Sequence, residues 1–131
     1  MEVRMSSAAV LSALAGLKEL SGVALPVRAA LKVRRLLREL GSIAEDVEAE
    51  RVRLLAQYAR KGADGQPEAD ERNQARFGDD AARESFERDY NELMGSEHAV
   101  TGEAIRAAEL GESAVVKPAA LAALGELLED G

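Results

Sequence analysis

The sequence contains a single histidine, His98, which restricts the catalytic and metal chemistry that the chain could perform. A zinc site built on two histidines and a metalloprotease helix each need a second histidine, so neither fits. A Ser-His-Asp triad could use His98, but we identify no serine in the strand–turn–helix pattern that exposes a nucleophile. Glycine-rich phosphate-binding loops are also missing. We therefore expect His98 to be exposed or at a strand edge, and we expect no enzyme activity, cofactor or metal ion.

Carboxylates are abundant in the second half of the chain, where a pair of them could act as acid and base or bind Mg²⁺. Asp80, Glu84 and Glu87 share one face of a predicted helix, because they are four and three residues apart. Arg83 and Arg88 are interleaved with them, which is typical of a solvated helix with ion pairs. A solvated acidic face is therefore favoured, and a metal site remains the less favoured alternative.

A run of basic residues at the start of a predicted long helix could bind phosphates or an acidic protein. It supplies five positive charges with no acid between them: Arg28, Lys32, Arg34, Arg35 and Arg38. The helical periodicity places this run roughly opposite the apolar stripe, so we expect it to point outward. Its acidic partner could be another molecule or the acidic second half of this chain. Phosphate binding would be salt-dependent, but the aromatic residues that stack on bases are not interleaved here. A solvated face without a partner is the simplest alternative.

The charge along the same helix then reverses twice, to acidic over residues 39–50 and to basic over residues 51–61. Such blocks favour self-association, because a staggered or antiparallel copy would place opposite charges together. Arg51 lies near the centre of the apolar stripe, where a leucine or alanine is expected. An unpaired buried guanidinium is costly. Arg51 must therefore either extend to water or pair with a carboxylate of the third helix or of another subunit.

The composition indicates what kind of fold positions these groups. A chain of 131 residues matches one domain, and its apolar residues are mainly alanine, leucine and valine. This favours closely packed helices over a β-sandwich. The absence of cysteine fits a reducing compartment. No signal peptide and no run of 18 apolar residues is apparent, so we expect no membrane span. The net charge of −7 argues against a general nucleic-acid coat.

Residues 1–61 are predicted to form a helical hairpin. Leucines at helical spacing indicate a first helix between Ser7 and Gly22, and Pro26 opens a long second helix. The short link between them predicts an antiparallel arrangement. One side of the long helix has the alternating four- and three-residue spacing of a coiled-coil seam. This predicted seam consists of Val33, Leu37, Leu40, Ala44, Val47, Arg51 and Leu54.

Residues 62–78 are predicted to form a loop or a flexible hairpin, and residues 79–131 an acidic helical part. Asp79 and Asp80 suit the first turn of a helix that ends at Gly95. Pro118 opens a last helix with Leu121, Leu124, Leu127 and Leu128 on one face. Short strands are predicted near the N-terminus, over residues 98–101 and over residues 114–116. The first and second of these are expected to pair.

The order of these features resembles a family of short proteins of unassigned function encoded by tailed bacteriophages of the siphophage type. The resemblance rests on Leu25-Pro26-Val27-Arg28, on Glu50-Arg51 with Tyr58-Ala59-Arg60-Lys61, and on the span from Pro118 to Asp130. These patterns extend over most of the chain, but none of them is a catalytic motif. Residues 99–112 depart from the family, whose members tend to have a β-rich segment there. The resemblance implies a phage origin rather than an activity.

We therefore expect a mainly α protein of one domain that acts by protein–protein contact, as a homo-oligomer. A virion or assembly factor and an inhibitor of a host defence or host enzyme are both open, in the cytoplasm of the infected bacterium or in the virion. An acidic protein suits the inhibitor role because it can occupy a basic nucleic-acid channel. The alternative is a nucleic-acid-binding protein that uses the basic run. The residues expected to contact a partner are Arg28, Lys32, Arg35, Arg38, Arg51, Asp79, Asp80, Glu84 and Glu87.

Overall fold

The computed structural model describes residues 2–72, 74–111 and 116–129, and it is mainly α-helical as predicted. Two compact units are present: Met1–Ala44 together with Glu97–Gly131, and Glu45–Ser96. This division cuts across the predicted segments 1–61, 62–78 and 79–131. The long helix α2 (Val27–Tyr58) contributes its first part to the first unit and its second part to the second unit.

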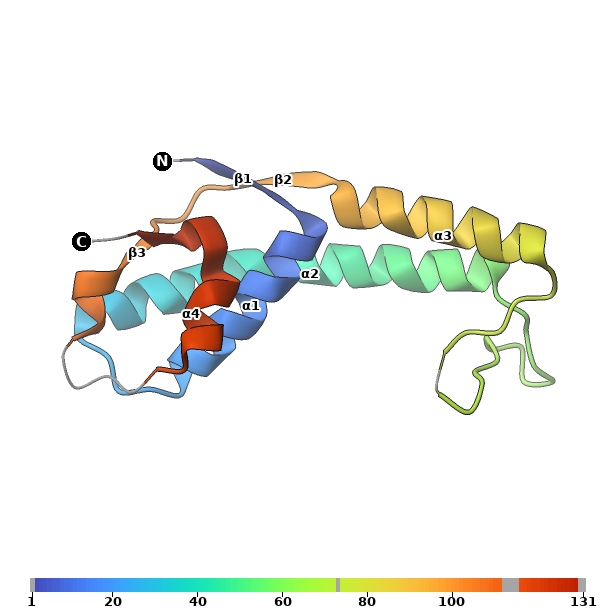
Figure 1. The fold of residues 1–131 in the computed structure, drawn as a ribbon, viewed down its shortest axis with the longest axis horizontal. Helices are drawn as coiled ribbons and strands as arrows, with labels where there is room; N and C mark the ends of the chain where they lie inside the picture. Colours follow the sequence, from blue (N-terminus) through green and yellow to red (C-terminus); the bar gives the residue numbers. More distant parts are fainter. Residues whose placement is uncertain (1, 73, 112–115, 130–131) are drawn as a thin grey trace. The chain divides into compact units, whose positions relative to one another are not determined.

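In the first unit, strand β1 (Val3–Ser6) leads directly into helix α1 (Ser7–Ser21) (Figure 1). The Ser6 hydroxyl caps this helix by accepting a hydrogen bond from the Ala9 amide at 3.1 Å. The helix ends just before Gly22, so its predicted start and end are confirmed. The short link over residues 22–26 joins α1 to α2, as predicted for the hairpin.

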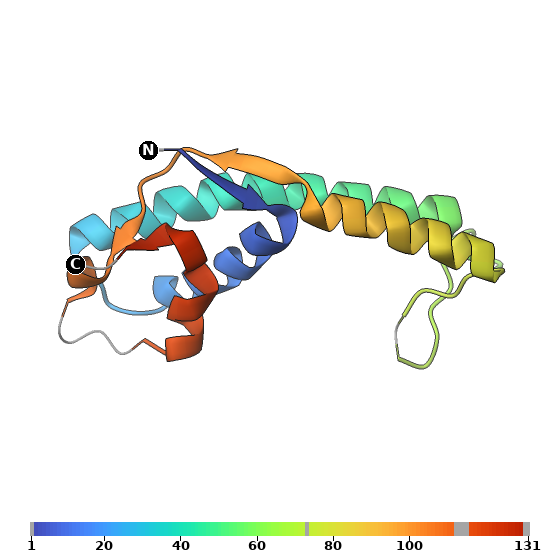
Figure 2. The same ribbon diagram turned by 45° about the horizontal axis from the view of Figure 1, so that its top comes forward.

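The core of the first unit brings α1 and α2 together with the C-terminal segment. Its fully buried leucines come from all three: Leu17, Leu20, Leu36, Leu40, Leu124 and Leu127. Helix α4 (Pro118–Leu124) lies beside α1 (Figure 2). The contact is close because Gly16 of α1 has no side chain: a Cβ atom there would lie 2.6 Å from the Ala120 carbonyl oxygen. Sequence periodicity did not reveal this helix pair.

Two small sheets complete the first unit. Strand β1 pairs antiparallel with β2 (Glu97–Val100), with Val3 opposite Val100, so the predicted pairing of these segments is confirmed. Strand β3 (Ile105–Arg106) pairs in parallel with β4 (Leu128–Glu129), which was not predicted. Short 3₁₀ turns precede and follow α4, at Ala107–Leu110 and Gly125–Leu127. The strand predicted at 114–116 falls mainly on residues 114 and 115, which lie outside the described residues.

The last helix is shorter than predicted. Helix α4 ends at Leu124 because Gly125 adopts a φ of 53°, in the left-handed region that favours glycine. Leu127 then lies in the 3₁₀ turn and Leu128 in β4, so the prediction of one helical face from Leu121 to Leu128 is wrong.

The second unit consists of the second part of α2, the segment over residues 59–79 and helix α3 (Asp80–Gly95). The Asp79 carboxylate caps α3 by accepting from the Ala82 amide at 2.8 Å, so the predicted start of this helix is confirmed. Helix α3 runs beside the second part of α2 (Figures 1 and 2). The segment predicted as a loop or hairpin folds back on itself, because the backbone groups of Arg60, Glu68 and Arg76 hydrogen-bond one another.

Candidate functional site

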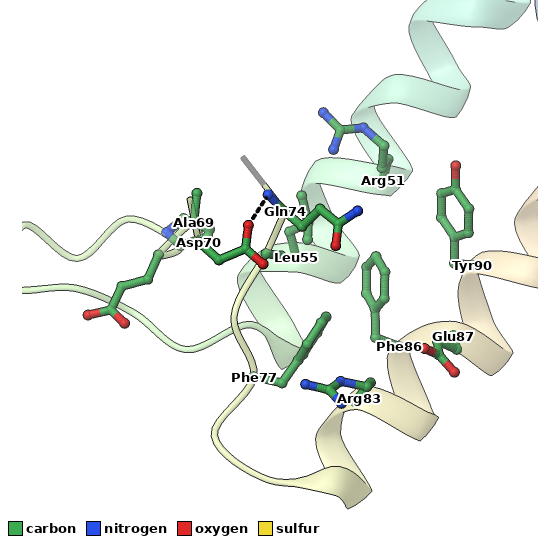
Figure 3. A pocket seen from close by; sticks show the side chains of 13 residues that line it. Arg51, Leu55, Ala69, Asp70, Gln74, Phe77, Arg83, Phe86, Glu87 and Tyr90 are labelled. Atoms are coloured by element: carbon green, nitrogen blue, oxygen red, sulfur yellow. Dashed lines mark hydrogen bonds between the residues drawn. The ribbon is translucent and has the colours of Figure 1, made fainter. Parts of the chain in front are cut away.

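An open cleft of about 930 Å³ lies within the second unit (Figure 3). Its walls come from the second part of α2, from the segment over residues 67–77, and from α3. The Asp70 carboxylate holds this segment in a turn by accepting from the Gln74 amide at 2.9 Å, drawn as a dashed line. The cleft is therefore bounded on one side by a turn-forming segment and on the others by two helices.

Aromatic rings form the apolar part of the cleft. The ring centroids of Phe77 and Phe86 are 5.2 Å apart, and those of Phe86 and Tyr90 are 5.6 Å apart. Phe86 and Tyr90 share one face of α3 because they are four residues apart. Leu55 of α2 adds an aliphatic side chain to the same wall. All three rings are only half-buried, so the cleft offers a ligand an apolar surface.

Sequence reasoning did not identify these rings as a site. Phe86 and Tyr90 were assigned only to an apolar stripe of the third helix, and Phe77 to a loop. A signal was nevertheless present, since every aromatic residue of the chain falls between residues 58 and 90. In a chain whose apolar residues are mainly alanine and leucine, this clustering of aromatic residues indicates that the large side chains belong to one region of the fold.

Arg51 lies on the wall of the cleft and pairs with Glu48 of the same helix. Its Nη2 and Nε atoms donate to the two Glu48 carboxylate oxygens at 2.6 and 2.9 Å. The hydrogen bond from Arg51 lowers the pKa of Glu48 and raises the pKa of Arg51, so both remain charged. Of the alternatives for Arg51, extension to water agrees with the structure, since its side chain is 41% exposed. The carboxylate that it pairs with lies one turn earlier on α2 and not on the third helix, as the i,i+3 spacing permits.

The predicted acidic residues have different surroundings in the structure. Glu87 lines the cleft, together with Glu68 and Asp70. Asp80 and Glu84 are exposed on α3, while Asp79 is the residue that caps this helix. The acids near the cleft therefore come from α3 and from the folded-back segment.

Tyr58 and Asp89 connect the two helices of the second unit. The Tyr58 hydroxyl donates a hydrogen bond to the Asp89 carboxylate at 2.7 Å. This bond raises the pKa of Tyr58 and lowers the pKa of Asp89. It helps to hold α3 in the position that aligns the aromatic rings along the cleft.

The basic run of α2 lies in the first unit and is only partly exposed. Arg28, Arg35 and Arg38 are exposed as predicted. The Lys32 side chain is only 12% exposed, so its predicted outward position is wrong. Its Nζ atom donates to a Glu109 carboxylate oxygen at 2.6 Å, which lowers the pKa of Glu109. The acidic partner of Lys32 is therefore part of the same chain.

His98 and Ser7 form a hydrogen-bonded pair in the first unit, with 2.8 Å between the serine Oγ and the histidine Nε2. Ser7 begins α1 directly after β1 with no turn between them, so it does not lie in the strand–turn–helix pattern that exposes a nucleophile. His98 lies in β2, which pairs only with β1 in a sheet of two strands among the described residues, so its expected position at a strand edge is confirmed. Ser7 is fully buried, so a substrate could reach its hydroxyl only by displacing the surrounding packing.

Two further properties concern metal ions and membranes. Over the described ranges, no three potential ligand side chains come together in a group that could hold a metal ion. None of the helices in the described part of the chain has both the length and the apolar content needed to cross a bilayer.

No protein family, no curated protein and no solved structure matches this chain. The geometry of the chain and its charges are therefore the basis on which a function can be proposed.

Proposed function

We propose that this protein is not an enzyme and that it acts by binding another protein through the cleft of the second unit. The observation that carries this proposal is that α3 is amphipathic and 16 residues long, yet none of its residues is fully buried. Half-exposed aromatic rings are characteristic of protein interfaces, where they supply a large contact area at low entropic cost. A partner side chain inserted beside Phe86 and Tyr90 would complete the burial that this chain leaves unfinished.

The charges around the cleft favour a partner with a basic surface. The cleft itself is lined by three acids and two arginines: Glu68, Asp70 and Glu87 against Arg51 and Arg83. Helix α3 with its cap residue Asp79 carries six acids and two arginines in all, so the surroundings of the cleft are also acidic. Complementary charge steers such a partner to the cleft and sets its orientation.

The biological setting is part of the same proposal. The resemblance to short phage proteins supports a role during phage infection, in the cytoplasm of the infected bacterium or in the virion. A basic partner fits the inhibitor role, in which the acidic unit occupies the nucleic-acid channel of a host enzyme or defence protein. A contact with another virion or assembly protein is the other form of the proposal.

A second candidate function, nucleic-acid binding, is favoured by the arginines of the first unit. No carboxylate in the described part of the chain forms an ion pair with Arg28, Arg35 or Arg38. Lys32 is already paired, which leaves fewer cations for phosphates than the sequence suggested. This candidate requires binding to a DNA or RNA duplex that weakens steeply with salt and is lost when the three arginines are reversed to glutamate.

Affinity capture from infected host lysate tests the leading proposal when wild type and variants are compared. Phe86→Ala and Tyr90→Ala remove the aromatic surface of the cleft, whereas Leu11→Ala truncates an exposed side chain of α1 that does not line it. We expect one partner to be retained by wild type and by Leu11→Ala, and to be lost at least about tenfold with either aromatic variant. Circular dichroism establishes that each variant is folded. A partner retained equally by all four proteins would contradict the proposal.

A further inference from the structure

Helix α2 presents a second ordered face, on the side away from the core. Val27, Leu31 and Val52 are the most exposed large apolar residues of the described chain, at 77, 45 and 52%. They belong to a series spaced by four and three residues, which keeps it on one helical face. We call this series the outer seam; it consists of Val27, Leu31, Arg34, Arg38, Gly41, Glu45, Glu48 and Val52.

The outer seam is distinct from the seam that the sequence analysis identified. Val33, Leu40, Val47 and Leu54 of the predicted seam are buried within this chain. At 3.6 residues per turn, the outer seam lies roughly 140° around the helix from these buried residues. The predicted seam is therefore used inside the molecule, and the outer seam is the one that α2 presents to solvent.

Between Leu31 and Val52, the chemistry of the outer seam is symmetric about Gly41. Moving outward from Gly41, Arg38 has its counterpart in Glu45, and Arg34 has its counterpart in Glu48 at an equal separation of seven residues. Beyond the charges, Leu31 and Val52 take corresponding positions. A second copy that runs antiparallel and crosses at Gly41 therefore places arginines opposite glutamates and Leu31 opposite Val52. Such a surface is complementary to itself in the antiparallel direction, which is the requirement for a two-fold interface.

Gly41 itself allows another helix to approach. Among the residues that the structure describes, a Cβ atom at this position would meet nothing within 4 Å. A glycine inside a helix lowers helix stability. None of the described residues packs so close to Gly41 that a side chain would be excluded there. At the crossing point of two helices, the absence of a side chain allows the backbones to come close together.

The charges of the seam are available to a partner. In the part of the chain that the structure describes, no ion pair involves Arg34, Arg38 or Glu45. Glu48 accepts hydrogen bonds from Arg51, but each carboxylate oxygen has a second acceptor site. A nucleic acid or an anionic bilayer would attract Arg34 and Arg38 while it repelled the two glutamates. A second copy of this helix satisfies both halves of the seam.

We propose that α2 pairs with α2 of a second copy in the antiparallel direction, outer seam against outer seam, with the two-fold axis at Gly41. The antiparallel pair deepens the proposed binding role, because it identifies a second copy of the chain as one partner. The cleft of the second unit stays available to a different protein. Exposed ion pairs each contribute little, and the apolar contacts are confined to the two ends of the seam. The dimer is accordingly weak, with a dissociation constant roughly in the micromolar to high-micromolar range that rises with salt.

Charge-reversed variants test the pairing on the purified full-length protein. The first variant carries Arg34→Glu with Arg38→Glu, and the second carries Glu45→Arg with Glu48→Arg. Each seam then bears one sign of charge only, so each variant alone should be monomeric in sedimentation equilibrium while the wild type forms dimers. Mixed together, the two variants should form a heterodimer, because every arginine then faces a glutamate. A wild type that stays monomeric up to near-millimolar concentration, or a mixture without complex, would overturn the proposal.

Cysteine trapping tests the direction of the pairing, since the chain has no cysteine of its own. In the antiparallel dimer, the two copies of position 52 lie roughly 33 Å apart at 1.5 Å per residue, too far for a disulfide. Position 52 of one copy instead lies near position 31 of the other. Oxidation should therefore cross-link a mixture of Leu31→Cys and Val52→Cys chains, but neither variant alone. Efficient cross-linking of Val52→Cys with itself would indicate a parallel pair and would refute the antiparallel arrangement.

The two proposals fail independently. Phe86→Ala leaves the outer seam intact, so it should not change sedimentation of the purified protein. The variant with Arg34→Glu and Arg38→Glu changes no residue that lines the cleft and leaves the Glu48–Arg51 pair intact, so capture of a partner by the cleft should persist in it. Loss of one property without the other shows which proposal is at fault.

Discussion

Replacement of Gly16 by alanine should weaken the contact between α1 and α4. The new Cβ atom would lie 2.6 Å from the Ala120 carbonyl oxygen, and 3.2 Å from both the Ala123 Cβ and the Leu124 Cδ2. The first of these is a backbone atom of a helix, so it cannot rotate away as the end of a flexible side chain could. The helices must therefore separate by several tenths of an ångström, and neighbouring core contacts loosen.

The size of the effect follows from two opposing contributions. Alanine is favoured over glycine inside a helix by about 1 kcal/mol. Insertion of a methyl group into a closely packed contact costs about 1–3 kcal/mol. Because the clash involves the backbone, we expect a cost near the upper end of this range. The free energy of unfolding should then fall by about 1–2 kcal/mol, which lowers the melting temperature by roughly 3–8 °C.

Gly41→Ala is the matched control, since it makes the same chemical change in a helix where a Cβ atom meets nothing within 4 Å. It should raise the free energy of unfolding by about 0.5–1 kcal/mol. Urea denaturation followed by circular dichroism at low micromolar concentration, where the monomer predominates, measures both variants. If Gly16→Ala stabilised the protein as much as Gly41→Ala does, the described packing of α1 on α4 would be refuted.

Three further predictions concern the core and the ion pairs. Leu36→Ala, at a fully buried position of α2, should lower the free energy of unfolding by about 2–5 kcal/mol. Leu31→Ala, on the exposed side of the same helix, should change it by about 0.5 kcal/mol or less. Equal losses of stability in urea denaturation would contradict the assignment of the buried and exposed faces of α2. Because the pKa of Glu109 is lowered in the folded state, the charged carboxylate stabilises the fold at pH values above its ordinary pKa near 4.5. This stabilisation is lost as the pH falls through the lowered pKa. Glu109→Gln should accordingly be less stable than wild type at pH 7, and the difference between their melting temperatures should disappear in acid; a difference independent of pH would be inconsistent with the ion pair to Lys32. Tyr58→Phe removes the hydroxyl that lowers the pKa of Asp89, so carboxyl titration by NMR should show a higher pKa for Asp89, and an unchanged value would contradict that hydrogen bond.

Local signals predicted the boundaries of most helices. Ser6 accepts a hydrogen bond at the start of α1 and Asp79 at the start of α3, and both residue types are recognisable as caps in the sequence. The strand pair was also predictable, because short segments near the N-terminus and near residue 100 both have the pattern of a strand, and they do pair in the structure. At Gly125 the same reasoning failed: the leucine spacing continued past it, but the left-handed φ of this glycine ended the helix.

Contacts between distant residues were not predictable from the sequence. Lys32 was assigned to a solvated face because its helical position is far from the apolar stripe, yet Glu109 reaches it across 77 positions of sequence. The cleft was missed for the same reason, since Phe77 meets Phe86 only because residues 59–79 fold back toward α3. Arg51 was recognised as unusual, but its position in the cleft depends on this folded-back segment. Periodicity describes one helix at a time and carries no information on what another segment brings against it.

The protein's proposed role as a binding protein is tested most directly by site-specific photo-crosslinking from inside the cleft. A photoreactive amino acid replaces Gln74, an exposed residue that lines the cleft, and in a second variant it replaces Asn91, an exposed residue of α3 that does not. In infected cells, position 74 should give one cross-linked protein that Phe86→Ala abolishes, and position 91 should give little of it. Equal cross-linking from both positions, or cross-linking from position 74 that Phe86→Ala leaves unchanged, would contradict a role for the cleft in binding a protein.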